Sequence, residues 1–471
     1  MLKLIFLGIF SLAVYANDAN SLLMQEVLME LRELRLENQK LKSRLDQLEQ
    51  KGQEVVMKVQ NQAVQLEKTH EQVAKNPIPK DRLGDRFHLS GDLRARYEGK
   101  DFKPNPVLQN EDFVGQRTRF RLDGQITPDT SITLRVLDQR EWGSRDGSRA
   151  GIPSEFTEFD LAFLELKNVF SKTSVRIGRQ ELAFADQTLI GPDGWDNRGR
   201  TFDAMAFRRE LNQGDAAHLF VSKVDIGRNL RNSSDDSDFS GLYFELDRHK
   251  NFKKDFYVLK KRDATLDRHL THWGFHTEYT KNAWDFMSQA GWQNGSQANL
   301  DFEAHHYKAG IGHTFTKSNG LRIGVERSVS SGDKNPLDNK VQSFDPLFGS
   351  NHDKYGIIDL FGNRNLTEDL LTVGWSPTQK SWVRLGYSRF SLSEVSDRIY
   401  DDNGNPLPIP NRLVDGKDLG NELSLQYTYM LRPNLAVFLG GGRYEADGAV
   451  STFLPQADGG KFYYFGSQIG F

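Results

Sequence analysis

The chain of 471 residues is predicted to form an all-β transmembrane barrel of about eighteen antiparallel strands, preceded by an α-helical coiled-coil segment. Residues 461–471 alternate between an apolar, aromatic face and a mixed face and end on Phe471, as the closing strand of a bacterial outer-membrane barrel does. The alternative is an ordinary edge strand. The N-terminus has the pattern of an export signal, and no other run is long and apolar enough for a transmembrane helix. Since only helices and closed barrels satisfy their backbone in lipid, a chain that spans a membrane here has to be a barrel.

Residues 1–16 are expected to be a signal peptide. A short basic start, Met1-Leu2-Lys3, precedes an apolar stretch at 4–14 that is too short to span a bilayer. Val14-Tyr15-Ala16 fits a small-residue cleavage site, so the mature chain is expected to begin at Asn17, outside the cytoplasm.

The composition agrees with an exported barrel. The chain has no cysteine and therefore no disulfide framework. Only 37% of its residues are hydrophobic, which suits a wet lumen and polar loops with a single apolar outer band. The formal net charge of −3 argues against a nucleic-acid partner.

Residues 17–75 are predicted to be a periplasmic coiled coil. With Met24 at heptad position a, the a and d positions form a long, mostly apolar seam. Asn38 at an a position is costly unless it meets its own copy, which favours a parallel homo-oligomer, dimer or trimer. A solvated helical spacer or a helix that packs on another protein is the alternative. The residues expected at the oligomer interface are Leu31, Leu34, Asn38, Leu41, Leu45 and Leu48. Residues 76–86, which contain Pro77 and Pro79, are expected to be a stiff linker.

Residues 87–471 are predicted to be the barrel. From Phe87 onward the apolar period changes to two, and tight turns such as Thr127-Pro128-Asp129-Thr130 alternate with long polar connections such as 143–156, 330–365 and 392–420. Outer-membrane barrels have short periplasmic turns and long external loops. We therefore expect the bacterial outer membrane as the location, its lipid as a partner, and both ends of the barrel on the periplasmic side.

The alternation also predicts which side chains face the lumen. Thr118, Phe120 and Leu122 share one face of a strand, whereas the opposite face carries a run of charge. A charged side chain facing lipid near the midplane costs roughly 2–4 kcal/mol, so the charged face is expected to point inward. By this argument the lumen residues are Arg94, Arg96, Arg117, Arg119, Arg121, Asp123, Arg135, Arg176, Arg322 and Arg384.

A lumen rich in guanidinium favours anions, because guanidinium binds carboxylates bidentately. The competing interpretation is that arginine and carboxylate ladders pair with each other and stiffen the wall. A general diffusion porin for small solutes, and a structural anchor or tether that acts through the coiled coil, are the alternative functions. We expect no enzyme and no cofactor, since no catalytic motif is present. The histidines are expected to be lumen or surface residues rather than metal ligands; they are His269, His272, His276, His305 and His306.

Three stretches resemble the alginate-export family of outer-membrane proteins. They are Val-Arg-Ile-Gly-Arg-Gln-Glu-Leu at 175–182 with Gly-Trp-Asp-Asn-Arg-Gly-Arg-Thr-Phe-Asp at 194–203, Phe-Asp-Pro-Leu-Phe-Gly-Ser-Asn-His at 344–352, and Gly-Asn-Glu-Leu at 420–423. The resemblance implies an eighteen-stranded barrel with an electropositive constriction that passes an acidic polysaccharide such as alginate, and it adds Arg179 and Arg200 to the solute path. Arg179 falls on the outward phase of a regular strand, which a bulge or a position above the lipid would reconcile. The resemblance also implies a monomeric barrel; the predicted coiled coil, which the family's best-known member lacks, departs from that pattern.

Overall fold

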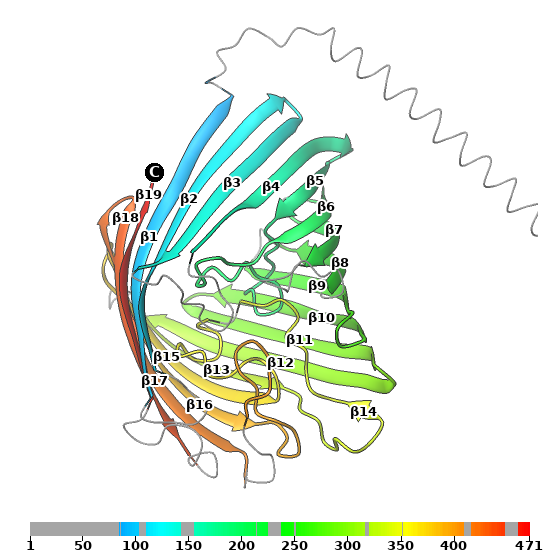
Figure 1. Cartoon of the computed structure of the whole chain (residues 1–471), viewed down its shortest axis with the longest axis vertical. Coiled ribbons are helices and arrows are strands. Elements are labelled where there is room, and N and C mark those ends of the chain that lie inside the picture. Colours follow the sequence, from blue (N-terminus) through cyan, green and yellow to red (C-terminus); the bar gives the residue numbers. More distant parts are fainter. Residues whose placement is uncertain are drawn as a thin grey trace, which may run out of the picture. The chain divides into compact units, whose positions relative to one another are not determined.

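The computed structural model describes residues 84, 86–102, 110–142, 155–212, 214–224, 237–248, 251–315, 320–350, 352–408, 416–447 and 460–471. The predicted signal peptide and coiled coil lie outside these residues. Arg82–Phe471 forms a compact unit, and within its described part the chain is a single antiparallel barrel (Figure 1). No helix in the described ranges is long and apolar enough to cross a membrane.

Eighteen strands close the barrel, which confirms the predicted fold. Each strand pairs with its neighbour in the chain, and the ring closes where the first and last strands pair from Asp92↔Gly470 to Phe102↔Gly460. The first nine strands are β1 (Phe87–Phe102), β2 (Glu111–Thr127), β3 (Thr130–Glu141), β4 (Glu155–Phe170), β5 (Thr173–Gln180), β6 (Phe202–Glu210), β7 (Ala216–Val224), β8 (Ser237–Leu246) and β9 (Phe252–Asp263).

The second half of the barrel continues the same antiparallel order. Its strands are β10 (Arg268–Lys281), β11 (Trp284–Gln297), β12 (Leu300–Phe315), β13 (Leu321–Ser330), β15 (Leu366–Thr378), β16 (Ser381–Leu392), β17 (Asp418–Arg432), β18 (Leu435–Ala446) and β19 (Gly460–Gly470). The two-residue strand β14 (Lys340–Val341) was not predicted. It lies inside the connection from β13 to β15, pairs in parallel with the first residues of β12, and is not part of the wall.

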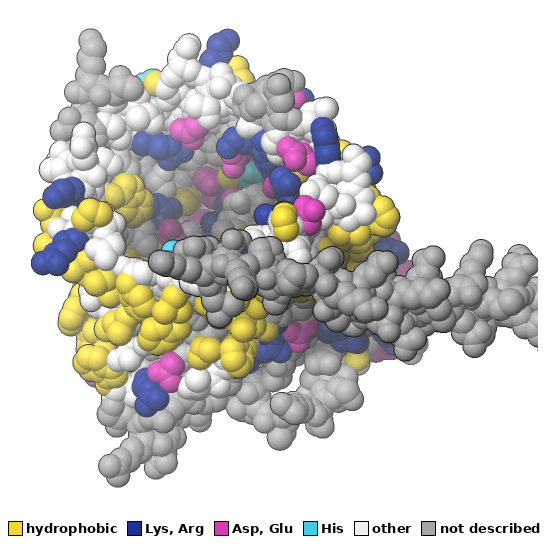
Figure 2. Space-filling view, turned by 90° about the horizontal axis from the view of Figure 1, so that it is seen from above, with side chains coloured by type: hydrophobic (Ala, Val, Ile, Leu, Met, Phe, Trp, Pro, Cys, Tyr) yellow, Lys and Arg dark blue, Asp and Glu magenta, His cyan; other side chains and the backbone are white. Residues whose placement is uncertain are grey.

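The outer face of the wall is apolar because alternate side chains of every strand point into lipid. Phe120, Leu423 and Phe465 are among the most exposed large side chains, at 50%, 58% and 60%. Figure 2 shows hydrophobic side chains gathered on the outside of the barrel and charged ones around its hollow. Tyr463, Phe465 and Phe471 all lie on the exposed apolar face, as expected for a closing strand.

The inner side of the wall is covered by three long connections. These are the β5–β6 loop (181–201), the β13–β15 loop (331–365) and the β16–β17 loop (393–417), of which residues 351 and 409–415 are not described. Phe202, Phe220 and Phe239 of the wall pack with Phe344 and Phe348 of the β13–β15 loop. Inward apolar side chains would otherwise face water, so burying them holds the loops inside the barrel.

Candidate functional site

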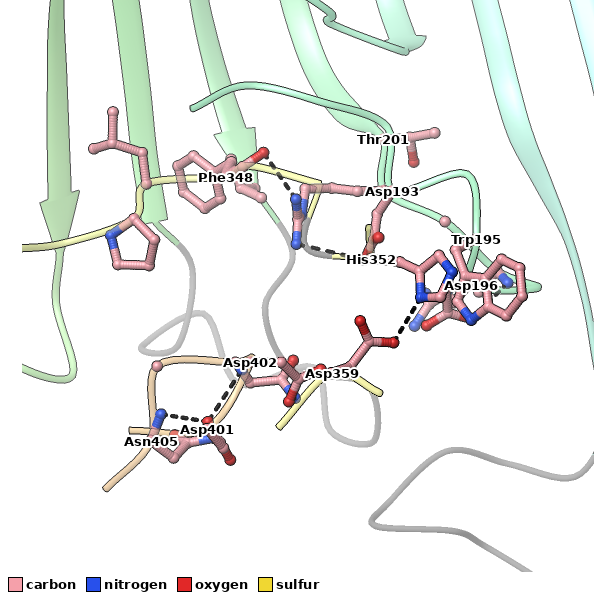
Figure 3. Close-up of a pocket in the computed structure, with 18 of the residues that line it drawn as sticks. Asp193, Trp195, Asp196, Thr201, Phe348, His352, Asp359, Asp401, Asp402 and Asn405 are labelled. Carbon is pink, nitrogen blue, oxygen red and sulfur yellow. Dashed lines mark hydrogen bonds and ion pairs between the residues drawn. The ribbon is translucent and has the colours of Figure 1, made fainter. Parts of the chain in front are cut away.

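The candidate site is a cavity of about 730 Å³ between the three inward-folded loops and the wall (Figure 3). Both the wall strands and the loops bring basic side chains to this cavity, and the loops bring most of the acidic ones.

The β13–β15 loop is anchored to one side of the wall through Asp345. This carboxylate binds Lys261 Nζ at 2.9 and 3.0 Å and pairs with Arg268, both on inward positions. Gln293 of β11 holds the main chain of Asp345, accepting from its N–H at 2.9 Å and donating to its carbonyl at 2.7 Å. Burial alone would raise the pKa of Asp345, but the Lys261 and Arg268 cations outweigh burial and hold the pKa below its ordinary value.

The same loop is also attached to a second part of the ring, at β16 and β17. The backbone N–H groups of Ile357 and Ile358 donate to the Glu422 carboxylate of β17 at 2.7 and 3.3 Å. Asp353 pairs with Arg384 of β16. Gly356, with a φ of +79°, lets the backbone turn at this contact, where a Cβ atom would stand 2.5 Å from Glu422. The loop therefore crosses the lumen from β9–β11 to β16–β17 and narrows it.

The β5–β6 loop is fastened to the β13–β15 loop. The guanidinium of Arg200 donates to the carbonyls of Phe348 at 2.8 Å and Gly349 at 2.7 Å. The indole of Trp195 stacks on the imidazole of His352, with ring centroids 3.6 Å apart (Figure 3). Arg200 lies in this loop and not on a strand. It reaches the lumen only because the loop folds inward.

Two of the predicted lumen arginines, Arg94 and Arg96, hold the β5–β6 loop. Arg94 donates to the Trp195 carbonyl at 2.8 Å and to Asn197 Oδ1 at 2.6 Å. Arg96 donates to the same Trp195 carbonyl at 3.0 Å and binds Glu98 at 2.6 and 2.8 Å. Both arginines are about 95% buried or more.

The other predicted strand arginines pair with carboxylates of their own strand, of nearby strands or of the inward-folded loops. Arg135 makes a bidentate contact with Asp160, which lies at a bulge in β4, and also binds Glu181. Each carboxylate that pairs with a guanidinium group reduces the net positive charge that a passing solute meets. The remaining pairs are Arg117 and Arg119 with Asp92, Arg121 with Asp123, Arg176 with Glu165, Arg322 with Asp285 and Arg384 with Asp353.

Arg179 lies at the end of β5, on the outward phase by its register with Asp203. It binds Asp203 at 2.8 Å and also reaches Glu158 at 3.3 Å, and all three residues line the cavity. Gly178, with a φ of +124°, changes the backbone direction just before it. The wall ends here, since β5 stops at Gln180, so a side chain at its rim can turn inward.

Acidic groups outnumber basic ones around the cavity. Seven basic side chains line it, namely Arg96, Arg179, Arg198, Arg200, Lys261, Arg268 and Arg364. Ten carboxylates line it, namely Glu98, Glu158, Asp193, Asp196, Asp203, Asp263, Asp345, Asp359, Asp401 and Asp402. Burial, followed by the nearby Asp359 carboxylate, raises the pKa of Asp402 to about 7. Burial likewise raises the pKa of Asp193.

Several residues of the site were not predicted from the sequence. Lys261 is one of them. Lys260, Lys261 and Arg262 form a run of three cations, so the sequence does not show which of them faces the lumen. The preceding Val258 and Leu259 are both apolar and do not show it either; only the structure shows that Val258 is exposed and Leu259 buried. Trp195 and Asp345 lie in the quoted motifs, but nothing local shows that they meet partners across the lumen.

The histidines lie on two sides of the wall. His272, His276 and His306 face inward and are buried, and Phe344 contacts the rings of His272 and His306. His269 and His305 take outward positions. No group of three or more histidine or carboxylate side chains in the described ranges is arranged to hold a metal ion.

Comparisons with known proteins agree with this architecture. The family model described as alginate export matches residues 86–457. Among solved structures, OccAB1 of Acinetobacter baumannii has a TM-score of 0.59 at 11% identity, covering 83% of this chain and 98% of that one. The outer membrane protein opdK of Pseudomonas aeruginosa has a TM-score of 0.55 at 12% identity, covering 82% and 99%. At these identities the likeness shows the fold alone. No curated protein matches the sequence.

Proposed function

The chain belongs to the alginate export family of outer-membrane channels, and we propose that it passes anionic solutes, with an acidic polysaccharide such as alginate among the candidates. The barrel places the protein in the bacterial outer membrane, in contact with its lipid.

The observation that carries the proposal is the charge on β1 and β2. Their inward positions bear six basic side chains, Arg94, Arg96, Lys100, Arg117, Arg119 and Arg121. The same positions bear four carboxylates, Asp92, Glu98, Glu111 and Asp123. This wall is therefore basic, and its guanidinium groups match carboxylates in geometry. A solute carboxylate that moves along it exchanges one charge-assisted contact for the next.

Planar-bilayer recording of the purified protein tests the proposal. In a KCl gradient the reversal potential is expected to show anion preference. Oligouronates, which are longer than a single sugar acid and fill the lumen, are expected to block the current. Arg119→Gln and Arg121→Gln are expected to weaken both effects. Arg389→Gln is the matched control, because Arg389 is an exposed, outward-facing arginine paired with Asp418. Cation preference, or equal effects of the lumen and control variants, would contradict the proposal.

A general diffusion porin is the second candidate. The excess of carboxylates around the cavity and the pairing of the strand arginines favour it. It predicts a current with little charge preference and no block by oligouronates, so the same recording separates the two functions.

We also propose that residues 17–75 assemble the protein into a homo-oligomer through a periplasmic coiled coil. The supporting observation is the heptad seam with Asn38 at a core position. A tether to another periplasmic component is the alternative for this segment. No catalytic activity is proposed.

A further inference from the structure

We propose that Arg94, Arg96 and Arg117 form a carboxylate-binding site that residues 194–197 of the β5–β6 loop occupy with their own oxygen atoms. An anionic solute would bind these guanidinium groups in place of the loop segment and so widen the constriction. This inference rests on the proposed passage of anions and specifies how it is regulated.

The three arginines converge on one short segment. Arg94 donates to the carbonyls of Gly194 at 3.0 Å and Trp195 at 2.8 Å, and more weakly to that of Asp196 at 3.3 Å. Arg117 donates to the Gly194 carbonyl at 3.3 Å, and Arg96 to the Trp195 carbonyl at 3.0 Å. Asn197 Oδ1 completes the set at 2.6 Å from Arg94.

The acceptors that the segment offers are neutral. Arg94 forms no ion pair with a carboxylate in the described part of the chain, although it is 95% buried. Three further buried donors lack an acceptor among the described residues: Nε of Arg94, Nη1 of Arg96 and Nε of Arg117. Burying a cation against neutral groups alone is unfavourable, and a hydrogen bond to a carboxylate is roughly twice as strong as one to a carbonyl. Arg96 and Arg117 already have the carboxylates of Glu98 and Asp92 beside them, whereas no described carboxylate pairs with Arg94. A solute carboxylate is therefore a better ligand for Arg94 than the segment that now fills the site.

The wall is shaped for the segment to approach closely. A Cβ atom at Gly115 of β2 would stand 2.5 Å from Asn197 Nδ2, so glycine makes room for the amide. Gly194, in contrast, is exposed and has nothing within 4 Å of a built Cβ. The segment thus lies against the arginines and faces open space at Gly194, and Trp195 holds it to His352 of the β13–β15 loop.

A nitroxide label on Gly194→Cys tests the inference by electron paramagnetic resonance. The natural chain has no cysteine, so the label goes to one place, and the open space at Gly194 accommodates it. In the full-length protein in liposomes, sodium glucuronate is expected to convert an immobilised spectrum into a mobile one, whereas glucose at the same concentration is not. Arg94→Gln is expected to make the label mobile without glucuronate. Arg389→Gln should behave as the unmodified channel does.

A second pair of variants locks the segment. The double variant Gly115→Cys, Asn197→Cys places two thiols where β2 and the β5–β6 loop come closest. A disulfide between them is expected to hold the loop against β2. Oxidation should then abolish the glucuronate-dependent rise in single-channel conductance, and reduction should restore it. The unmodified channel, which has no cysteine, treated with the same oxidant is the control for this result.

Failure of this inference can be told from failure of the proposed function. A label that never responds to glucuronate, in a channel whose reversal potential shows anion preference, overturns the displacement and leaves the function standing. A label that glucose mobilises as well as glucuronate also overturns it. Cation preference in the recording contradicts the proposed function whatever the label does.

Discussion

The indole ring of Trp195 lies flat on the imidazole of His352, with planes 11° apart and ring centroids 3.6 Å apart. The guanidinium of Arg96 stands 3.5 Å from the centroid of the same indole. Two groups at this distance have to occupy opposite faces, so the indole is enclosed between β1 and the β13–β15 loop. Asp359 accepts a hydrogen bond from the His352 ring at 2.8 Å and orients it. One side chain therefore joins two loops and the barrel wall.

Trp195→Ala is expected to raise the single-channel conductance and its fluctuations. The change removes an aromatic stack worth about 0.5–1.5 kcal/mol and a cation–π contact of about 0.5–2 kcal/mol, so the β5–β6 loop is held less firmly. Trp273→Ala is the control, because Trp273 faces lipid and stacks on Trp292. Equal conductance in both variants would show that the indole does not restrict the pore.

Asp345→Asn is expected to release the β13–β15 loop from β9–β11. It leaves Lys261 and Arg268 as buried cations without their carboxylate, which typically costs about 3–5 kcal/mol. Limited proteolysis should cut the loop faster, and urea unfolding should show a lower free energy. Asp338→Asn, on an exposed position of the same loop, should change neither. An anchor that survives the first substitution would argue that the apolar contacts of Phe344 and Phe348 hold the loop alone.

Anion preference is expected to increase as the pH falls through about 7. Burial and nearby carboxylates raise the pKa of Asp402 to about 7, so this group is ionised above that pH and neutral below it. Asp359, Asp401 and Asp193 surround it and add to the shift, while Lys100 opposes it. Protonation therefore removes one negative charge from the cavity.

The reversal potential between pH 8 and pH 6 measures this change. Asp402→Asn should show the low-pH selectivity at both values, because its amide cannot ionise. A pH dependence that is unchanged in Asp402→Asn would assign the titration to another group. Asp301→Asn, on an exposed outward position of β12, is the matched control.

Deletion of residues 17–75 is expected to convert an oligomer into single barrels without changing the unit conductance. The heptad seam is the proposed oligomer interface, and the barrel carries the solute path. Light scattering of the detergent-solubilised protein before and after deletion measures the mass. Asn38→Ile should keep the assembly but allow other oligomeric states, since a buried asparagine sets the register and the number of helices in a coiled coil. An unchanged mass after deletion would reject the coiled coil as the interface.

The barrel itself could be predicted from the sequence because its determinants are local. Alternation along a strand depends on neighbouring residues, and lipid excludes charge from the outer face of every strand alike. Phe120 and Arg119 therefore take opposite sides of the wall from their positions alone, and the turns between strands set the strand count. The same local signals predict the signal peptide and the coiled coil, which remain predictions.

What only the tertiary structure decided is which groups meet inside. Asp345 binds Lys261 across 84 residues of chain, and Arg94 binds the Trp195 carbonyl across 101. Alternation places a side chain in the lumen but does not choose its partner, and a loop sequence does not show that the loop folds inward. These contacts follow from the closed ring, which brings distant strands face to face across a space that the loops fill. The charge that a solute meets therefore depends on pairings that no local pattern contains.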